Sequence, residues 1–152
     1  MTAMTLSPAQ RLHAERNLPR YTSYPTALAF DSAHASHAEG WYGATGPDDR
    51  LSVYVHVPFC RRLCWYCGCH TSIAPTYDRV GSYLDVLRRE IDLVAGRLGE
   101  HDGLAHLHFG GGSPNALRPE DFVDLTARLA RAFRLRPGAE IAAELDPGML
   151  SQ

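Results

Sequence analysis

Four cysteines within ten residues are the feature of this sequence that most directly suggests chemistry. Cys60, Cys64, Cys67 and Cys69 give the spacing C-x3-C-x2-C-x-C, and the 152-residue chain contains no other cysteine. Thiolates are the ligands that iron–sulfur clusters and structural zinc prefer. Cys67 and Cys69 are too close together for both to close one tetrahedral zinc site well, whereas an iron–sulfur cube offers corners further apart. The spacing favours a cluster held by Cys60, Cys64 and Cys67, with zinc binding and inert buried cysteines as the alternatives.

Three polar side chains are expected on the face of a sheet that points away from the core. Residues 51–57 alternate with period two, which places Tyr54 and His56 opposite the apolar positions. Glu144 has the same polar parity in a third expected strand, at 140–145. Tyr54 could equally be a core residue, and His56 a histidine with ordinary hydrogen-bond partners.

A glycine run at the end of the second expected strand, 104–109, is a further candidate for ligand binding. Gly110, Gly111 and Gly112 precede Ser113 and Pro114. Missing side chains would let a ligand with an ammonium group approach the backbone carbonyls, although such a run is often only a turn. His106 and His108 share one face of the same strand. They have the spacing of a metal pair, but ordinary hydrogen-bonded histidines are the favoured interpretation.

The elements that must position these residues alternate between strand and helix. Two helices are expected between the three strands, and each has an apolar stripe at helical spacing. The first stripe is Val80, Leu84, Leu87, Ile91, Val94 and Leu98, and the second, after Pro119, is Phe122, Leu125, Leu129 and Phe133. The order β-loop-α-β-loop-α-β predicts parallel strands joined by right-handed crossovers.

The predicted fold class is α/β, and the favoured architecture is part of a barrel whose polar strand face lines a lumen. A complete (β/α) barrel needs about 250 residues, so we expect the front part of a larger enzyme. Residues 1–50 are expected to form an irregular N-terminal arm, and residues 51–152 an incomplete barrel. The alternative is an open doubly wound sheet, but the cysteine loop stands where its G-x-G-x-x-G motif would be.

Composition and charge exclude several classes of protein. The chain is 45% hydrophobic and 21% charged, with a net charge of −2, which disfavours a disordered protein or a basic nucleic-acid binder. All 15 basic residues are arginine, so no lysine Schiff base can form. No apolar run is long enough to cross a membrane, and the first residues lack a secretion signal. We therefore expect a cytoplasmic protein that binds neither membrane nor nucleic acid.

The combined motifs resemble a known family. C-x3-C-x-Tyr-C after a first strand is similar to the radical S-adenosylmethionine superfamily. More narrowly, the segment Tyr54-Val-His-Val-Pro-Phe-Cys60, the additional Cys69 and the arm Arg20-Tyr-Thr-Ser-Tyr-Pro-Thr-Ala27 resemble the oxygen-independent coproporphyrinogen III oxidases of haem biosynthesis. The resemblance covers about residues 18–150.

The resemblance implies a (β/α)6 three-quarter barrel of the TIM type, a [4Fe-4S] cluster and two molecules of S-adenosylmethionine. The reduced cluster cleaves S-adenosylmethionine to a 5′-deoxyadenosyl radical, which takes a hydrogen atom from a substrate propionate. Loss of CO2 and one electron leaves a vinyl group, and two rounds convert coproporphyrinogen III to protoporphyrinogen IX. The electron donor is unknown, and the enzyme is expected to be a monomer.

The resemblance also implies roles for individual residues. Cys60, Cys64 and Cys67 match the cluster ligands, and Cys69 matches a cysteine that does not bind the cluster. The positions that match S-adenosylmethionine contacts are Tyr54, Tyr66, Gly111, Gly112, Ser113 and Glu144, with Ser113 standing where family members usually have threonine. Candidates for contact with the substrate are Arg20, Tyr21, Tyr24 and His56.

Two other functions remain open at this point. Radical S-adenosylmethionine haem chaperones keep the C-x3-C-x2-C loop but lack the Arg20–Ala27 arm and the following cysteine. A zinc-stabilised interaction module is the third possibility. Whichever holds, we expect the 152 residues alone to be inactive and poorly folded, because the lumen face lacks an opposite wall.

Overall fold

The computed structural model describes residues 7–8, 11–12 and 31–150, with the backbone alone at 33–35 and 39. The chain divides into two compact units, residues 1–37 and residues 38–152. In the first unit, Ser32–His37 form a short 3-10 helix, η2. The predicted substrate residues Arg20, Tyr21 and Tyr24 lie outside the described residues.

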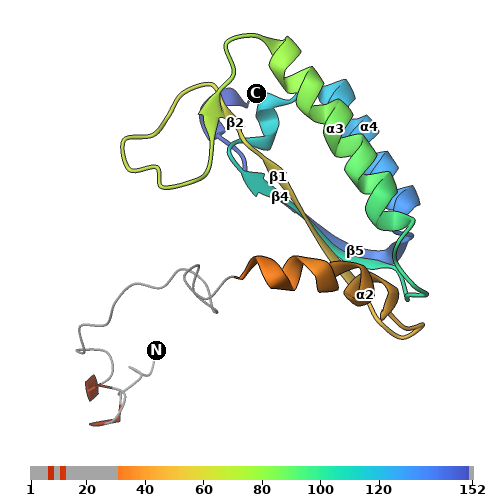
Figure 1. Cartoon of the computed structure of the whole chain (residues 1–152). Helices are drawn as coiled ribbons and strands as arrows, with labels where there is room; N and C mark the ends of the chain where they lie inside the picture. The colour runs from red at the N-terminus through yellow and green to blue at the C-terminus, as the bar shows by residue number, and fades with distance from the viewer. Residues whose placement is uncertain (1–6, 9–10, 13–30, 151–152) are drawn as a thin grey trace. The chain divides into compact units, whose positions relative to one another are not determined.

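A three-stranded parallel sheet forms the centre of the second unit. The strands β1 (Leu51–Val57), β4 (Leu104–Gly111) and β5 (Leu135–Ala143) lie in the order β1-β4-β5. The helices α3 (Tyr77–Ala95) and α4 (Pro119–Ala132) connect them and lie side by side over one face of the sheet (Figure 1). This arrangement confirms the predicted parallel β/α order. None of the helices formed by the described residues is long and apolar enough to span a membrane.

The hydrophobic core lies between this sheet and the two helices, because each element turns its apolar side to the others. The predicted stripe of α3 is buried at Val80, Leu84, Leu87 and Ile91. Strand and helix residues that are at most 1% exposed complete the centre of the core: Val57, Leu104, Leu107, Phe109, Leu125 and Leu129. The opposite face of the sheet carries the polar side chains and has no covering element among the described residues.

The third strand differs from the predicted one at both ends. It begins at Leu135 and ends at Ala143, so Glu144 and Leu145 lie beyond it. Ile141 does pair in register with the buried Leu107, as the predicted alternation requires, yet its side chain is 49% exposed. Among the described residues, the helices leave this part of β5 exposed, although Leu135 at the start of the strand packs against the core. The second strand is also longer than predicted, since β4 runs through Gly110 and Gly111.

The segment before β1 is less irregular than predicted. Ala38–Gly43 form a short helix, α2, that belongs to the same compact unit as the sheet. Its end is held by the loop after α3, where the Gly99 amide donates to the Tyr42 carbonyl at 3.0 Å. Such long-range contacts leave no periodic signal in the sequence, so the prediction missed the helix.

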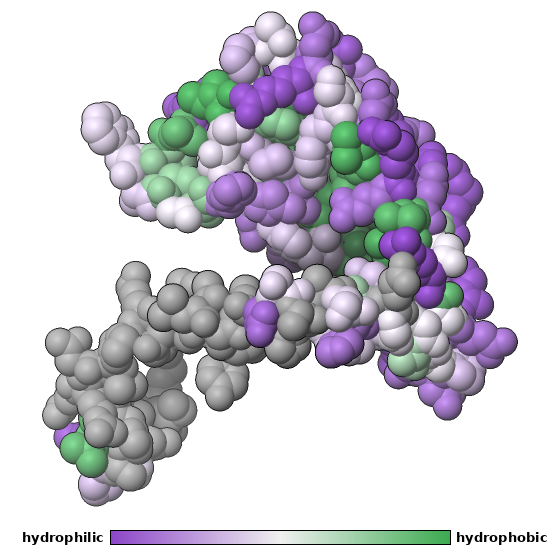
Figure 2. Space-filling view, viewed as in Figure 1, coloured by the Kyte–Doolittle hydropathy of each residue, from purple (hydrophilic) through white to green (hydrophobic). Residues whose placement is uncertain are grey.

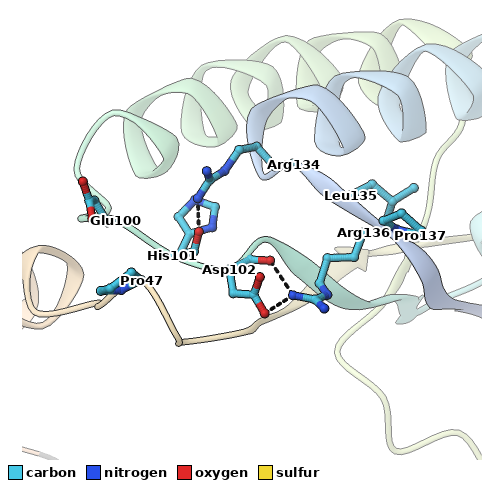
Figure 3. A pocket seen from close by; sticks show the side chains of 8 residues that line it. All are labelled: Pro47, Glu100, His101, Asp102, Arg134, Leu135, Arg136 and Pro137. Carbon is cyan, nitrogen blue, oxygen red and sulfur yellow. Dashed lines mark hydrogen bonds and ion pairs between the residues drawn. The ribbon is translucent and has the colours of Figure 1, made fainter.

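A pocket of about 670 Å³ lies where β4 and β5 begin, at the opposite end of the sheet from the cysteine loop (Figure 3). The Arg136 guanidinium contacts both the side-chain carboxylate and the backbone carbonyl of Asp102. The Arg50 guanidinium lies 3.4 Å from the same carboxylate. Arg134 donates to the His101 carbonyl. Burial, together with the charge of Arg134, lowers the pKa of His101. These contacts join the loops that precede three strands, so we assign this end of the sheet a structural role.

Candidate functional site

The candidate site lies at the carboxyl ends of the three parallel strands. The cysteine loop follows β1, the glycine run ends β4, and Glu144 follows β5. Because these ends meet at one edge of a parallel sheet, residues far apart in sequence come together there (Figure 1). This edge is where ligands bind in open α/β sheets and in barrels.

The cysteine loop is closed at its base by a small pair of strands that the sequence did not predict. β2 (Phe59–Cys60) pairs in parallel with β3 (Ser72–Ile73), and the Ser72 amide donates to the Pro58 carbonyl at 2.9 Å. Beyond this base the loop projects from the sheet, and Figure 2 shows hydrophobic surface gathered over it.

Two aromatic residues at the tip of the loop are exposed. The side chain of Trp65 is fully exposed and that of Tyr66 is 90% exposed. Among the described residues, the projecting loop offers the Trp65 ring no covering surface. Tyr66 lies on the same loop as the cysteines, as the predicted S-adenosylmethionine contact requires.

The three predicted cluster ligands differ in their surroundings. Cys60 is half-buried, with its Sγ 3.3 Å from Thr71 Oγ1 and 3.8 Å from Ser113 Oγ, whereas Cys64 and Cys67 are exposed. Within the residues that the structure describes, no three His, Cys, Asp or Glu side chains lie close enough together to hold a metal ion. Three free thiols on one closed loop nevertheless form a soft donor set of the kind that iron–sulfur clusters use, so the residues present fit such a cluster.

Cys69 differs from these three in its electrostatics. A hydrogen bond with the Cys67 side chain raises the pKa of the Cys69 thiol, and the negative charges of Cys67 and Glu144 raise it further. A raised pKa favours the protonated thiol, whereas a cluster ligand must be a thiolate. Because Cys67 and Cys69 share this hydrogen bond, the shift belongs to the pair and does not by itself decide which of the two thiols binds a metal.

Tyr54 and His56 form a hydrogen-bonded chain that ends on the cysteine loop. His56 Nε2 lies 2.8 Å from the His70 carbonyl oxygen, and His56 Nδ1 lies 3.1 Å from the Tyr54 hydroxyl. A carbonyl can only accept, so Nε2 donates to it and the neutral ring accepts from Tyr54 at Nδ1. Both ring nitrogens of His56 therefore form hydrogen bonds with other residues of the protein. The predicted contact of His56 with the substrate stays a prediction.

The glycine run is required by close approach of neighbouring groups. Gly111 has a φ of +102°, and a Cβ there would lie 2.4 Å from the His56 ring. A Cβ at Gly112 would lie 2.5 Å from the Phe59 carbonyl oxygen. The run thus lets β4 pack directly against β1 and the start of the cysteine loop.

Glu144 is gathered with Tyr54 and His108 over the first glycine of the run. Its Oε1 lies 3.3 Å from His108 Nε2, and the Tyr54 and His108 rings are 5.8 Å apart. A Cβ at Gly110 would lie 3.0 Å from both Glu144 Cδ and Tyr54 Cε2. Burial, followed by the charge of Glu144, raises the pKa of Tyr54, so its hydroxyl stays protonated at neutral pH.

Sequence reasoning did not assign His108 or Gly110 to this group. His108 was considered only as half of a metal pair with His106, and the structure instead places each of these histidines beside a glutamate. The signal was present in the alternation of 104–109 and 140–145, which puts these histidines and glutamates on the same face. The missing information was the register, which pairs Ala142 with His108 and so brings Glu144 near its ring.

Comparison with known proteins agrees with this geometry. The model of the radical SAM superfamily matches residues 54–151. The oxygen-independent coproporphyrinogen III oxidase of Bradyrhizobium diazoefficiens is 46% identical over 91% of this chain and 31% of its own length. That of Escherichia coli is 40% identical over 85% of this chain and 28% of its own length. A protein of the same name from Mannheimia haemolytica is 40% identical, and the match covers 85% of this chain and 88% of that protein.

A solved structure is also similar. The coproporphyrinogen III oxidase of Escherichia coli, described as a radical SAM enzyme, matches with a TM-score of 0.77 and 38% identity over 86% of this chain and 30% of that one. This match confirms the prediction that the parallel β/α units are part of a radical SAM barrel. The chain therefore belongs to the radical SAM superfamily and, within it, to the family of the oxygen-independent coproporphyrinogen III oxidases.

Proposed function

We propose that this chain serves the oxidative decarboxylation of coproporphyrinogen III, in which two propionates become vinyl groups and protoporphyrinogen IX is formed. The observation that carries the proposal is the meeting of the cysteine loop, the glycine run and Glu144 at one edge of the sheet. Relatives named for this activity support it. The chain spans only 31% of the length of the Bradyrhizobium diazoefficiens relative and 28% of that of the Escherichia coli relative. The activity of a whole enzyme is therefore proposed for this chain and not taken from its relatives.

Cys60, Cys64 and Cys67 would hold a [4Fe-4S] cluster and leave one iron open for S-adenosylmethionine. When bound, the two cofactors supply the carbon radical that removes a hydrogen atom from the substrate propionate. The chain contributes a closed loop that presents the thiols, with Cys60 already seated beside Thr71 and Ser113. Cys69 would be left out of the ligand set, because it matches the cysteine of the family that does not bind the cluster.

Tyr54, Gly111, Gly112, Ser113 and Glu144 would bind S-adenosylmethionine at the cluster, and Tyr66 would contact a bound molecule from the loop. The bare glycine backbone admits the ammonium end, and the Glu144 carboxylate can accept hydrogen bonds from the ribose hydroxyls. Tyr54 closes the group on the side of β1 (the ring lies over Gly110). We expect two molecules of S-adenosylmethionine in the complete site.

The substrate and the electron donor are the remaining partners in the proposal. Arg20, Tyr21, Tyr24 and His56 are proposed to contact coproporphyrinogen III, with the guanidinium paired to a propionate. The cysteine loop carries Arg61 and Arg62, and residues 51–77 contain no acidic side chain, which suits an acidic one-electron donor. We further propose that the protein is a monomer. We also propose that it acts in the cytoplasm, because its free cysteines need a reducing compartment.

The test uses a chimera. Residues 1–152 replace the matching part of the Escherichia coli relative, and the anaerobically reconstituted protein is incubated with coproporphyrinogen III, S-adenosylmethionine and a reductant. We expect a vinyl product, and no product from the same chimera carrying Cys64→Ser. A chimera that folds and holds its cluster but forms no product would contradict the proposal.

The two alternative functions are outcomes of the same preparation. Haem binding by the chain, with no vinyl product formed from coproporphyrinogen III, would identify a haem chaperone. Stoichiometric zinc in place of iron would identify an interaction module.

A further inference from the structure

We propose that His108 is a positioning residue that holds the Glu144 carboxylate in the orientation that receives S-adenosylmethionine. The inference rests on the proposed function, since it takes Glu144 to be the group that contacts this ligand. Its basis is the hydrogen bond between His108 Nε2 and Glu144 Oε1, at 3.3 Å. An ionised carboxylate can only accept, so Nε2 carries the proton and donates it.

His108 is fixed by the strand that carries it. It lies inside β4, paired in register with Tyr54 on one side and Ala142 on the other. Its ring therefore projects from the middle of the sheet onto the open face, and the Tyr54 ring lies beside it. A side chain anchored in the central strand is a suitable reference point for a more mobile partner.

Glu144, by contrast, lies beyond the end of β5. Its amide still donates to the Phe109 carbonyl at 2.9 Å, so the backbone continues in line with the sheet. The side chain is 59% exposed, and a glutamate in that situation has several rotamers available. Gly110, which has no side chain, leaves room for the carboxylate, and the hydrogen bond from His108 restricts its orientation.

The two carboxylate oxygens consequently have different surroundings. Oε1 accepts from His108, whereas Oε2 lies over Gly110, 3.1 Å from where a Cβ would be. The carboxylate keeps a free oxygen at the glycine run, where the proposed ligand enters. His108 thus acts through Glu144 and need not touch the ligand itself.

The same strand offers a matched control. His106 lies two residues earlier on the same face, with its Nδ1 3.8 Å from the Glu140 carboxylate. This pair is more exposed, with side chains 63% and 75% accessible, and it lies further from the glycine run. A general effect of removing a histidine from the open face should appear in both variants, whereas a positioning effect should appear only at His108.

The experiment measures the dissociation constant of S-adenosylmethionine for the chain and its variants within the anaerobically reconstituted chimera described above, with iron content and far-UV circular dichroism checked for each. We expect Glu144→Ala to raise the constant about tenfold and His108→Leu about fivefold, both within the range of one ordinary lost hydrogen bond. His108→Gln keeps a donor of similar reach and should stay within about twofold of the unaltered chain. His106→Leu should do the same.

A double variant separates positioning from a structural effect. Because His108 acts through Glu144, His108→Leu should add nothing to the loss already caused by Glu144→Ala. His108→Asn, whose amide is too short to reach Oε1, is the second test should the leucine variant not fold. Unchanged binding in the folded His108→Leu or His108→Asn variant, with weakened binding in Glu144→Ala, would overturn this inference alone. Unchanged binding in Glu144→Ala, or none in the unaltered chain, would overturn the proposed site as well.

Discussion

Cys60 is held by the fold itself, whereas Cys64 and Cys67 depend on the projecting loop. Its Sγ has two hydroxyl neighbours, Thr71 on β3's side of the loop and Ser113 after the glycine run. Hydroxyl groups near a thiolate can donate hydrogen bonds to it. Cys60 therefore joins the cluster ligands to the group that is proposed to bind S-adenosylmethionine.

Exchange of single cysteines tests the ligand set. Cys60→Ser, Cys64→Ser and Cys67→Ser should each abolish the cluster of about four irons, because a neutral hydroxyl replaces a thiolate ligand. Cys69→Ser should retain it, since Cys69 matches the cysteine of the family that does not bind the cluster. Iron content and visible absorbance after anaerobic reconstitution give the measurement. Loss of the cluster from the Cys69 variant would show that the ligands have been assigned wrongly.

The floor of the site gives a second prediction. Gly110→Ala would place a Cβ 3.0 Å from both the Glu144 carboxylate carbon and the Tyr54 ring, so both groups must move. We expect weaker S-adenosylmethionine binding, by about one order of magnitude, with the iron content unchanged. Gly81→Ala on α3 is the control, because a Cβ there has open space. Equal binding by the two variants would show that nothing binds over Gly110.

Residue types and spacing predicted most of this site, but not how its members contact one another. The cysteines, Tyr54 and Glu144 were found because thiols cluster in one loop and polar residues alternate with apolar ones. The contact of His108 with Glu144 depends on the register of β4 against β5, and the seat of Cys60 beside Ser113 depends on two loops meeting. Neither register nor loop contact leaves a local pattern in the sequence.

At the scale of the elements, β4 is the strand on which the others depend. It lies between β1 and β5, and its inward residues Leu107 and Phe109 are buried against the helices. Outward, His108 and Gly110 form the middle of the candidate site. The same strand therefore supplies both the centre of the core and the reference for the polar groups.

A pair of adjacent positions on β4 and β5 tests whether the central strand contributes more to stability than the outer one. Leu107 is 1% exposed and its neighbour in register, Ile141, is 49% exposed. Leu107→Ala should lower the free energy of unfolding by about 2–4 kcal/mol, because it leaves a cavity in the core. Ile141→Ala should cost less than about 1 kcal/mol, since much of that side chain already contacts water. Urea unfolding followed by circular dichroism measures both, and equal losses would mean that β5 is covered.

The sequence predicted the elements better than their ends. Helical stripes and strand alternation identified α3, α4 and the inward faces of β1 and β4, because burial imposes those periods. The small pairing of β2 with β3 and the helix α2 were missed, since both are held by contacts with distant residues. The exposure of Ile141 was missed for a related reason, because alternation gives the direction of a side chain and not what covers it.

At the scale of the whole molecule, the described residues cover the sheet on one side only. Helices α3 and α4 lie over the apolar face, and within the described part of the chain the polar face is open (Figure 1). The proposed cofactor groups are on that open face. The described residues therefore provide groups that could bind S-adenosylmethionine, but they do not enclose the space in which a porphyrinogen would react.

We expect the 152-residue chain to assemble the cluster and yet form no vinyl product. Cluster assembly needs only the closed loop, whereas turnover needs the substrate fixed beside the reacting carbon and shielded from water. The measurement is product analysis after incubation with coproporphyrinogen III, S-adenosylmethionine and reductant. Vinyl product from the chain alone would show that these residues suffice.

The pairing of β2 with β3 has a consequence for how the cluster is acquired. By joining the two ends of the cysteine segment, it restricts the thiols to a small volume before any iron arrives, which raises their effective concentration for one another. The backbone hydrogen bonds between β2 and β3 already offset the entropic cost of closing the loop. Because that cost grows only slowly with loop length, the pairing at the two ends of the loop matters more than the number of residues between them. Once one thiol has bound iron, the second and third thiols bind it intramolecularly. We therefore expect the loop to close before iron binds, and not because iron binds.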